Sequence, residues 1–512
     1  GDVTISGGTI TATGGSLGAG IGGGAYGNGT VTVTDGDITA KATGNYGAGI
    51  GGGYGAIPED TLIGGNGTVT ISGGTITEAS GGYMAAGIGS GYQGLGTVTI
   101  EGDAVIKNAQ GGEAGAGIGS GTDGDSNILI RGNAIIENAE SKTGGAGIGS
   151  GQGFLYYDDD IEETIIDKTV GNVTIEGNAK IENAKSGYGG SGIGGGAIGI
   201  GNVIIRGNAQ IGNATGGEEG AGIGGGALGT GDVTIEGNVT IENAQGGAGA
   251  AGIGGGAETE PDTEDTRNKV SIKSTEAGSP NITATGGGVL NGVGVLDDYV
   301  SLPVGAAAIG SGSVADGATE VKSDITIEGK VTINATGGGD VAIGDSTNGE
   351  TQFSGLQVGT TITRRNGKGD DVSQPGDVVR EQAPTETEAA EAPSTGSVEV
   401  ERPVTVEGLY VTNVLGKQIT HTCTQNGTTL TIRANGIVAS AHLTLGMVRT
   451  LKAQGVKTLV FTTLLSRSTT VSVDALLAAE PDAPDETAVV WTHTGPCAAL
   501  TIDGADHSAL LK

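Results

Sequence analysis

Tyrosines are the side chains in this sequence whose type and placement best suggest a chemical task. Eight of the ten tyrosines lie between residues 26 and 188, and six of them flank a recurring Gly/Ala/Ile cassette. Exposed rings beside a groove can stack on the apolar faces of sugars, while Asp, Asn and backbone groups hold the hydroxyls. The alternative is that the rings only cover turns made of small residues. The candidate carbohydrate-binding residues are Tyr26, Tyr46, Tyr54, Tyr83, Tyr92, Tyr156, Tyr157 and Tyr188.

A second group of reactive residues lies near the C-terminus, in the segments His421-Thr-Cys423 and His493-Thr-Gly-Pro-Cys497. His-x-Cys is not a usual zinc spacing. A Cys423–Cys497 disulfide would close a loop of roughly 75 residues and contribute about 4 kcal/mol in the chain-entropy model. We therefore treat the disulfide as a candidate, with a zinc site and two buried free thiols as the alternatives.

Catalytic constellations are scarce in the rest of the chain. No His precedes residue 421, which excludes a His-based triad or a His-ligated metal from that part of the sequence. The GxGxxG strings follow no βαβ pattern, so they do not indicate a dinucleotide site. We predict no catalytic residues and no cofactor.

The elements that must position these residues follow from an internal repeat. The cassette recurs ten times, and five of the nine gaps between its central isoleucines are 29 or 30 residues. A fixed period of this size is typical of stacked units. The central isoleucines are Ile21, Ile50, Ile88, Ile118, Ile148, Ile193, Ile223, Ile253, Ile309 and Ile343.

Each repeat contains three short segments with period-two alternation, separated by Gly, Asn and Asp. This pattern predicts one coil of a parallel β-helix per repeat, with about ten coils of ~30 residues. Two columns support the stacking. One holds alternating charges (Glu101, Arg131, Glu176, Arg206, Glu236), and the other holds amides that we expect to point inward and form a ladder (Asn108, Asn138, Asn183, Asn213, Asn243).

Composition changes along the chain define three regions. We assign residues 1–365 to the β-helix, 366–397 to an acidic, Pro-rich linker, and 398–512 to a small α+β module. The module is expected to have five short strands and one helix, on which Leu445, Val448 and Leu451 recur every three residues. Four inserts interrupt the coils, at residues 54–65, 152–170, 258–269 and 289–304.

The net charge of −33 argues against nucleic acid and against anionic lipid as partners. No apolar run is long enough for a membrane span, so we expect no membrane insertion. Gly1 already lies inside a repeat and no signal peptide precedes it, so we expect the chain to be part of a longer protein with neighbouring domains.

The run GTVTISGGTITEASGGYMAAGIGSG (67–91), like residues 1–24, resembles repeats in cell-surface proteins of clostridial-type Gram-positive bacteria. It is similar to a family of carbohydrate-binding, right-handed parallel β-helix proteins. The resemblance covers residues 1–345 and implies an extracellular location, with binding of acidic plant polysaccharides and of calcium. For calcium, only the loose pair Asp123/Asp125 and the run Asp158, Asp159, Asp160 offer ligands.

These observations predict a non-catalytic extracellular protein whose β-helix binds a polysaccharide, either of the host or of a cell wall. Two alternatives remain open at this point. The chain could be a structural stalk or adhesin spacer that presents other domains, or it could be a polysaccharide lyase or hydrolase.

Overall fold

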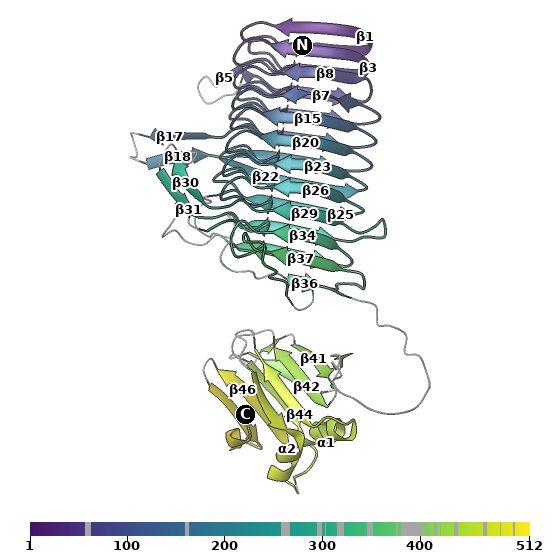
Figure 1. The fold of residues 1–512 in the computed structure, drawn as a ribbon, viewed down its shortest axis with the longest axis vertical. Coiled ribbons are helices and arrows are strands. Elements are labelled where there is room, and N and C mark those ends of the chain that lie inside the picture. The colour runs from purple at the N-terminus through teal and green to yellow at the C-terminus, as the bar shows by residue number, and fades with distance from the viewer. Residues whose placement is uncertain are drawn as a thin grey trace. The chain divides into compact units, whose positions relative to one another are not determined.

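The computed structural model describes residues 1–56, 63–158, 163–257, 267–293, 299–302, 304–314, 322–345, 352–374, 377–379, 402–404, 406, 408–413, 417–419, 421–426, 428–434, 439–463, 468–481, 483–494 and 497–511. The chain forms two compact units, Gly1–Pro384 and Thr385–Lys512. The first is a parallel β-helix (Figure 1), which confirms the predicted fold class.

The cassettes form one face of the helix, as a sheet of ten two-residue parallel strands. Each strand consists of the central isoleucine and the following glycine, and each pairs with the same two residues of the next coil; Ile193, for example, pairs with Ile223. The strands are β2 (Ile21–Gly22), β4 (Ile50–Gly51), β9 (Ile88–Gly89), β13 (Ile118–Gly119), β16 (Ile148–Gly149), β21 (Ile193–Gly194), β24 (Ile223–Gly224), β27 (Ile253–Gly254), β32 (Ile309–Gly310) and β35 (Ile343–Gly344).

The other two faces belong to a single sheet of 21 strands. One face contains β1 (Asp2–Gly14), β3 (Gly29–Ala42), β7 (Gly67–Ile71), β10 (Gly96–Ile100), β14 (Ser126–Ile130), β19 (Thr169–Ile175), β22 (Gly199–Gly207), β25 (Gly231–Gly237), β28 (Asn268–Lys273), β33 (Ser323–Glu328) and β36 (Gln352–Ser354). The next contains β8 (Thr75–Ser80), β11 (Val105–Ile106), β12 (Ala109–Gln110), β15 (Ile135–Ser141), β20 (Lys180–Ser186), β23 (Gln210–Thr215), β26 (Thr240–Gln245), β29 (Asn281–Thr285), β34 (Thr332–Thr336) and β37 (Thr361–Arg365). The long strands β1 and β3 run through both faces, because β1 pairs with β3 along its length and β3 pairs with both β7 and β8.

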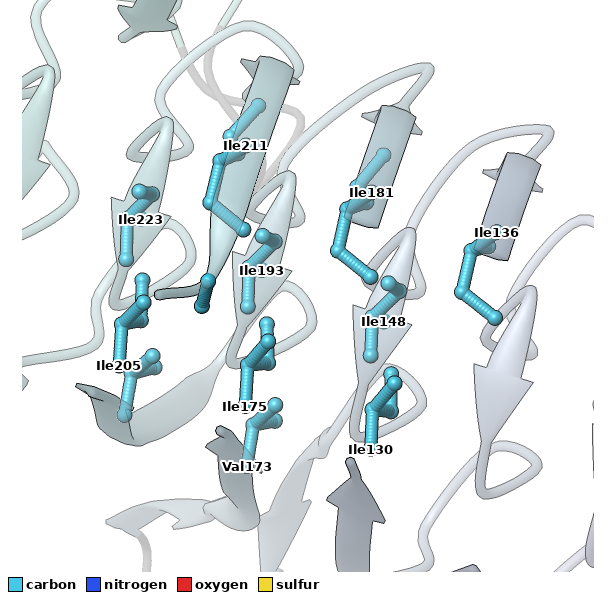
Figure 2. Close-up of a cluster of buried hydrophobic side chains, with 14 of the residues drawn as sticks. Ile130, Ile136, Ile148, Val173, Ile175, Ile181, Ile193, Ile205, Ile211 and Ile223 are labelled. Carbon is cyan, nitrogen blue, oxygen red and sulfur yellow. The ribbon is translucent and has the colours of Figure 1, made fainter. Parts of the chain in front are cut away.

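The core consists of files of aliphatic side chains that come from all three faces of each coil (Figure 2). In β19 every second residue is buried, so Val173 and Ile175 point inward and Thr174 does not. Ile175 lies in register with Ile130 and Ile205, and Ile181 lies in register with Ile136 and Ile211. Each fully buried isoleucine contributes about 1.5–3 kcal/mol, and the contribution repeats from coil to coil.

Glycine follows the central isoleucine in every cassette because neighbouring backbones approach too closely for a side chain. These ten glycines have φ between 130° and 148°, a region that L side chains rarely adopt. A Cβ placed on Gly119 would overlap the carbonyl oxygen of Gly149 in the next coil. The cassette face is therefore the thin side of the core, as its composition predicted.

The predicted charge column forms discrete ion pairs. Arg131 Nε and Nη2 both donate to Glu101 Oε2, at 2.7 and 2.5 Å. Arg206 makes the same two bonds to Glu176 Oε2, at 2.8 and 2.6 Å. Register pairs Glu236 with Lys273, whose Nζ lies 3.3 Å from Glu328, so the alternation extends two coils further than predicted.

The amide ladder exists, but it faces outward. Asn183 Nδ2 donates to Asn138 Oδ1 at 3.2 Å, and the series continues through Asn213 and Asn243 at 3.0 and 3.3 Å. The prediction that these amides point inward is wrong because the alternation of β20 is interrupted: Ile181 and Ala184 are buried while the two residues between them are half-buried. Two further surface ladders join Asn133, Asn178, Asn208 and Asn238, and Asn127, Asn172 and Asn202.

The end of the β-helix at β37 is closed by the segment that follows it. Arg364 is 1% exposed, and its guanidinium donates to both carboxylate oxygens of Asp377. The backbone N–H of Ile362 donates to Asp377, and that of Val379 donates to Thr360. The ordered unit therefore continues past residue 365, where composition placed its end, because a buried ion pair holds these polar residues against the last coil.

Three of the predicted inserts carry short antiparallel hairpins. They are β5 (Gly55–Ala56) with β6 (Ile63–Gly64), β17 (Phe154–Asp158) with β18 (Glu163–Asp167), and β30 (Leu290–Val293) with β31 (Tyr299–Leu302). Figure 1 shows all three on the same side of the β-helix. Most of the remaining insert, residues 258–266, lies outside the described residues.

The second unit is an α+β module with two sheets. One sheet contains β38 (Arg402–Pro403), β41 (His421–Asn426), β42 (Thr429–Ala434), β44 (Thr458–Thr462) and β45 (Ser468–Ser472). The other contains β39 (Tyr410–Thr412), β40 (Gln418–Ile419), β43 (Ala439–Thr444), β46 (Ala488–Thr494), β47 (Cys497–Ile502) and β48 (Ala505–Asp506). The predicted helix is α1 (Leu445–Ala453), which buries Leu445, Val448 and Leu451. The helix α2 (Val473–Ala479) and a 3₁₀ turn (Ser508–Leu510) were not predicted.

We expect Gly119→Ala to destabilise the β-helix by about 2 kcal/mol or more, because it adds a Cβ at positive φ against a neighbouring backbone. Gly15→Ala is the matched control, since nothing lies within 4 Å of a Cβ at that position. Thermal unfolding followed by far-UV circular dichroism measures both. Equal melting temperatures for the two variants would contradict the close-approach argument.

We expect Arg131→Glu to lower the melting temperature at low ionic strength, with a cost of about 1 kcal/mol. The change removes the pair with Glu101 and places a third acid between Glu101 and Glu176. High salt should reduce the difference because the pair is exposed. Arg131→Gln, which removes the pair without adding repulsion, should lie between wild type and Arg131→Glu.

Candidate functional site

Four of the eight tyrosines that the sequence suggested as carbohydrate-binding residues form one cluster on the first three coils. We call Tyr26, Tyr46, Tyr54 and Tyr92 the tyrosine cluster. Ring centroids are 5.3 Å apart for Tyr26 and Tyr54, 4.7 Å for Tyr46 and Tyr54, and 5.6 Å for Tyr46 and Tyr92. Tyr54 and Tyr92 are stacked at 5.9 Å with 11° between their planes. These distances lie in the range of favourable aromatic pairs.

Backbone hydrogen bonds between coils explain why these rings meet. The backbone N–H of Tyr92 donates to the carbonyl of Tyr46 at 3.1 Å, and that of Tyr54 donates to Leu17 at 2.8 Å. Residues that follow the cassette in one coil therefore lie beside residues that precede it in the coil before. Tyrosines on either side of the cassette consequently converge on one surface.

The cluster is open to solvent at one end. Tyr26 is 54% exposed, whereas Tyr46, Tyr54 and Tyr92 are half-buried. Among the described residues, none forms a hydrogen bond with the hydroxyl groups of these four tyrosines. The cluster therefore presents both ring surface and polar groups that a ligand can use.

Two polar residues extend the cluster: Gln93, which sequence reasoning missed, and Asp123, which it named only as a candidate calcium ligand paired with Asp125. Gln93 follows Tyr92, and its Nε2 donates to Asp123 Oδ2 at 3.0 Å in the next coil. Burial raises the pKa of Asp123 and the nearby Asp167 and Asp125 raise it further, while the bond from Gln93 lowers it. Burial, followed by the charge of Asp123, raises the pKa of the Tyr92 hydroxyl. The site is thus a group of rings beside a partly desolvated carboxylate.

Gln93 and Asp123 belong to a column of residues with left-handed backbone, and the offset that these residues share is the signal in the sequence that could have linked the two. Each member lies five residues after a central isoleucine and has φ between 55° and 58°. A β-branched residue such as Ile198 is a genuine outlier at such a φ, so the conformation comes from the coil and not from the residue type. The column contains Tyr26, Gln93, Asp123, Ile198 and Leu228.

The other predicted tyrosines lie apart from the cluster. Tyr83 is 50% exposed and has no ring contact with the cluster among the described residues. Tyr188 lies several coils further on, where it forms a parallel bridge with Glu218. The backbones of Tyr156 and Tyr157 belong to hairpin strand β17, but their side chains are outside the described part of the structure.

Of the candidate calcium ligands, only Asp123 and Asp125 have described side chains. Asp158 ends β17 with an undescribed side chain, and Asp159 and Asp160 lie outside the described residues. Within the described ranges, no group of three or more His, Cys, Asp or Glu side chains is placed to hold a metal ion. The Asp125 carboxylate accepts a hydrogen bond from the Val170 backbone at 2.8 Å.

In the second unit, Cys423 is a buried free thiol, so the Cys423–Cys497 disulfide considered above is not formed. The two cysteines belong to different sheets, on β41 and β47, and the Cys497 side chain is not described. Burial raises the pKa of the Cys423 thiol to about 11. His493 Nε2 shares a hydrogen bond of 2.7 Å with Thr469, which also accepts from Trp491. This arrangement is typical of a core histidine.

Two concave surfaces also occur among the described residues. A groove of about 350 Å³ follows the charge column and is lined by Arg131, Glu176, Arg206, Glu236, Thr275 and three glycines. A pocket of about 540 Å³ in the second unit lies between α1 and four residues outside that helix, Val404, Val406, Gln425 and Leu430. The arginines of the groove already pair with glutamates, which leaves the tyrosine cluster as the stronger candidate.

The comparisons with known proteins agree with this fold. A family described as Beta helix repeat matches residues 3–25 and 69–92. Curated proteins and solved structures gave no match. Together with the strand pairing, the match to the Beta helix repeat family supports a parallel β-helix built from repeats for the first unit of the chain. Among its described residues, no helix has the length and apolar character needed to cross a bilayer.

We expect Cys423 to react with a thiol reagent far more slowly in the native protein than in denaturant, because the buried thiol ionises only at high pH. In the variant Cys497→Ser, Cys423 is the only cysteine of the chain, so the measured reaction rate belongs to that thiol alone. Wild-type protein in denaturant without reductant should give two titratable thiols per chain. Finding no titratable thiol would contradict this result and show that Cys423 and Cys497 form a disulfide.

Proposed function

We propose that this chain is a non-catalytic, extracellular surface protein whose β-helix binds a polysaccharide at the tyrosine cluster. The observation that carries the proposal is the convergence of four rings from three successive coils, with Tyr26 more than half exposed. Aromatic side chains supply rigid, amphipathic contact area, and their faces pack against the C–H surfaces of sugars. An array that extends along a solenoid suits a polymer better than a small molecule.

The cluster is not needed to build the coil, which favours a binding role over a structural one. Tyr54 and Tyr92 each lie four residues after a central isoleucine. In later coils the same position is occupied by Ala197 and Ala227, which are buried in the same fold. Because alanine satisfies this position elsewhere, we infer that the rings serve a task specific to the first coils.

The surface location and the neighbouring domains of a longer protein remain part of the proposal. They are supported by the resemblance of the repeats to bacterial cell-surface repeats and by the strongly acidic composition. A structural stalk is the competing function, since the repeating columns along the β-helix would serve it equally well.

The proposal is tested by screening the whole chain against a panel of polysaccharides, with calcium and with chelator. We expect a glycan ligand whose affinity falls about tenfold in the double variant Tyr54→Ala/Tyr92→Ala, because two aromatic contacts of about 0.5–1.5 kcal/mol each are removed. Tyr410→Ala, an exposed tyrosine of the second unit, is the control and should bind like wild type.

A screen without any glycan ligand, or wild-type affinity in the double variant, would favour the stalk. Release of unsaturated uronides or of new reducing ends from a bound polysaccharide would favour a lyase or a hydrolase. Circular dichroism of the double variant should match wild type, as the alanines in later coils predict.

A further inference from the structure

The electrostatic environment of the tyrosine cluster is acidic. The strongest charged influences on Tyr92 and Asp123 come from carboxylates: Asp123 acts on Tyr92, and Asp167 and Asp125 act on Asp123. The whole chain carries a net charge of −33. A negative field from both near and distant groups lowers the local concentration of anions and raises that of cations.

Asp123 is held in place at the edge of the rings. Its backbone has φ of 58°, and its N–H donates to the Gln152 carbonyl of the next coil at 2.8 Å. Gln93 Nε2 donates a hydrogen bond to Asp123 Oδ2 at 3.0 Å, and among the described residues Asp123 Oδ1 has no hydrogen-bond partner. The carboxylate therefore has one oxygen available, at a fixed position next to Tyr92 and Gln93.

Aromatic faces beside an oriented carboxylate attract organic cations. A ring quadrupole attracts an ammonium group over its face by about 0.5–1 kcal/mol at an exposed site. A partly desolvated carboxylate adds a charge-assisted hydrogen bond, which is roughly twice as strong as a neutral one. Polyuronates, by contrast, would meet a repulsive surface, and no described group of acids is placed to recruit a bridging metal ion.

We propose that the tyrosine cluster and Asp123 select a cationic glycan, a polymer of amino sugars with protonated amines. The sugar rings lie against Tyr26, Tyr54 and Tyr92, and an ammonium group donates to Asp123. This inference rests on the proposed function, because it names the class of polysaccharide at the same site. It departs from the acidic plant polysaccharides that the family resemblance implied.

The test compares three oligosaccharides of equal length by isothermal titration calorimetry with the full chain: a glucosamine oligomer, its N-acetylated counterpart and an oligogalacturonate. At slightly acidic pH and low salt, we expect the glucosamine oligomer to bind at least tenfold more tightly than the other two. Raising the ionic strength to about 0.5 M should remove most of this preference, because screening at that salt acts over only a few ångströms.

Variants locate the preference. Asp123→Asn keeps the shape of the side chain and one acceptor oxygen for Gln93, but it removes the charge and replaces the other oxygen by an NH2 donor. The preference for the glucosamine oligomer should therefore fall about fivefold or more while binding of the acetylated oligomer stays unchanged. Asp232→Asn is the matched control, because Asp232 is an exposed acid on β25, several coils from the cluster. It should leave all affinities as in wild type.

The outcomes separate the two proposals. Equal or tighter binding of the acetylated oligomer or of the oligogalacturonate, still lost in Tyr54→Ala/Tyr92→Ala, would overturn the cationic preference and leave glycan binding intact. Equal losses in Asp123→Asn and Asp232→Asn would reduce the preference to bulk charge attraction and overturn it. Tighter binding of a lysine-rich peptide at the same residues would replace the glycan by a peptide. Failure of every oligosaccharide to bind would remove the proposed function itself.

Discussion

The close approach of backbones on the cassette face is the constraint on which the rest of the β-helix depends. The glycine after each central isoleucine has positive φ. From Gly22 to Gly310 these glycines also have no room for a Cβ, because the carbonyl oxygen of the equivalent glycine in the next coil occupies that space. This contact fixes the position of one corner of every coil. The other two faces have the same coil-to-coil register as the cassette strands, so their buried aliphatic side chains align in files and their outward side chains align in columns.

The hydrogen bonds that flank this corner also create the candidate site. They bring the residue four positions after one cassette next to the residue four positions before the cassette of the preceding coil, as Tyr92 and Tyr46 show. Residues 46 positions apart in sequence thus share a surface. A surface of this kind arises from the coil geometry, and the side chains make the difference: Tyr54 and Tyr92 occupy in the second and third coils the position that Ala197 and Ala227 occupy in later ones.

Much of this architecture could be predicted from the sequence because a solenoid is nearly one-dimensional. The period alone places Ile193 beside Ile223, and it predicts the partners of Arg131 and Arg206. The outward direction of the Asn183 side chain could not be predicted. A strict two-residue alternation would place Asn183 on the same side as Ile181, but the strand skips one residue between the buried Ile181 and Ala184, and this irregularity is visible only in the structure. Cys423 and Cys497 lie far apart in sequence, and spacing cannot show that they belong to different sheets.

The site was predicted in part, for a related reason. The tyrosines stand out because aromatic residues are rare in this chain. Gln93 is a common polar type that gains importance only from its hydrogen bond to the next coil, and Asp123 was noted as a candidate calcium ligand and not as part of the tyrosine surface. The end of the β-helix was predicted too early in the chain. The polar composition after residue 365 suggests a linker, but Asp377 forms a buried ion pair with Arg364 and so belongs to the ordered unit.

That pair also has a consequence for self-assembly. A bare terminal strand is a template for another chain, and stacked coils could in principle polymerise end to end. At β37 the hydrogen-bonding groups are instead taken by residues 377–379, and the buried charges would have to be exposed before a second molecule could add there. The edge of β37 is thereby covered against pairing with a second molecule.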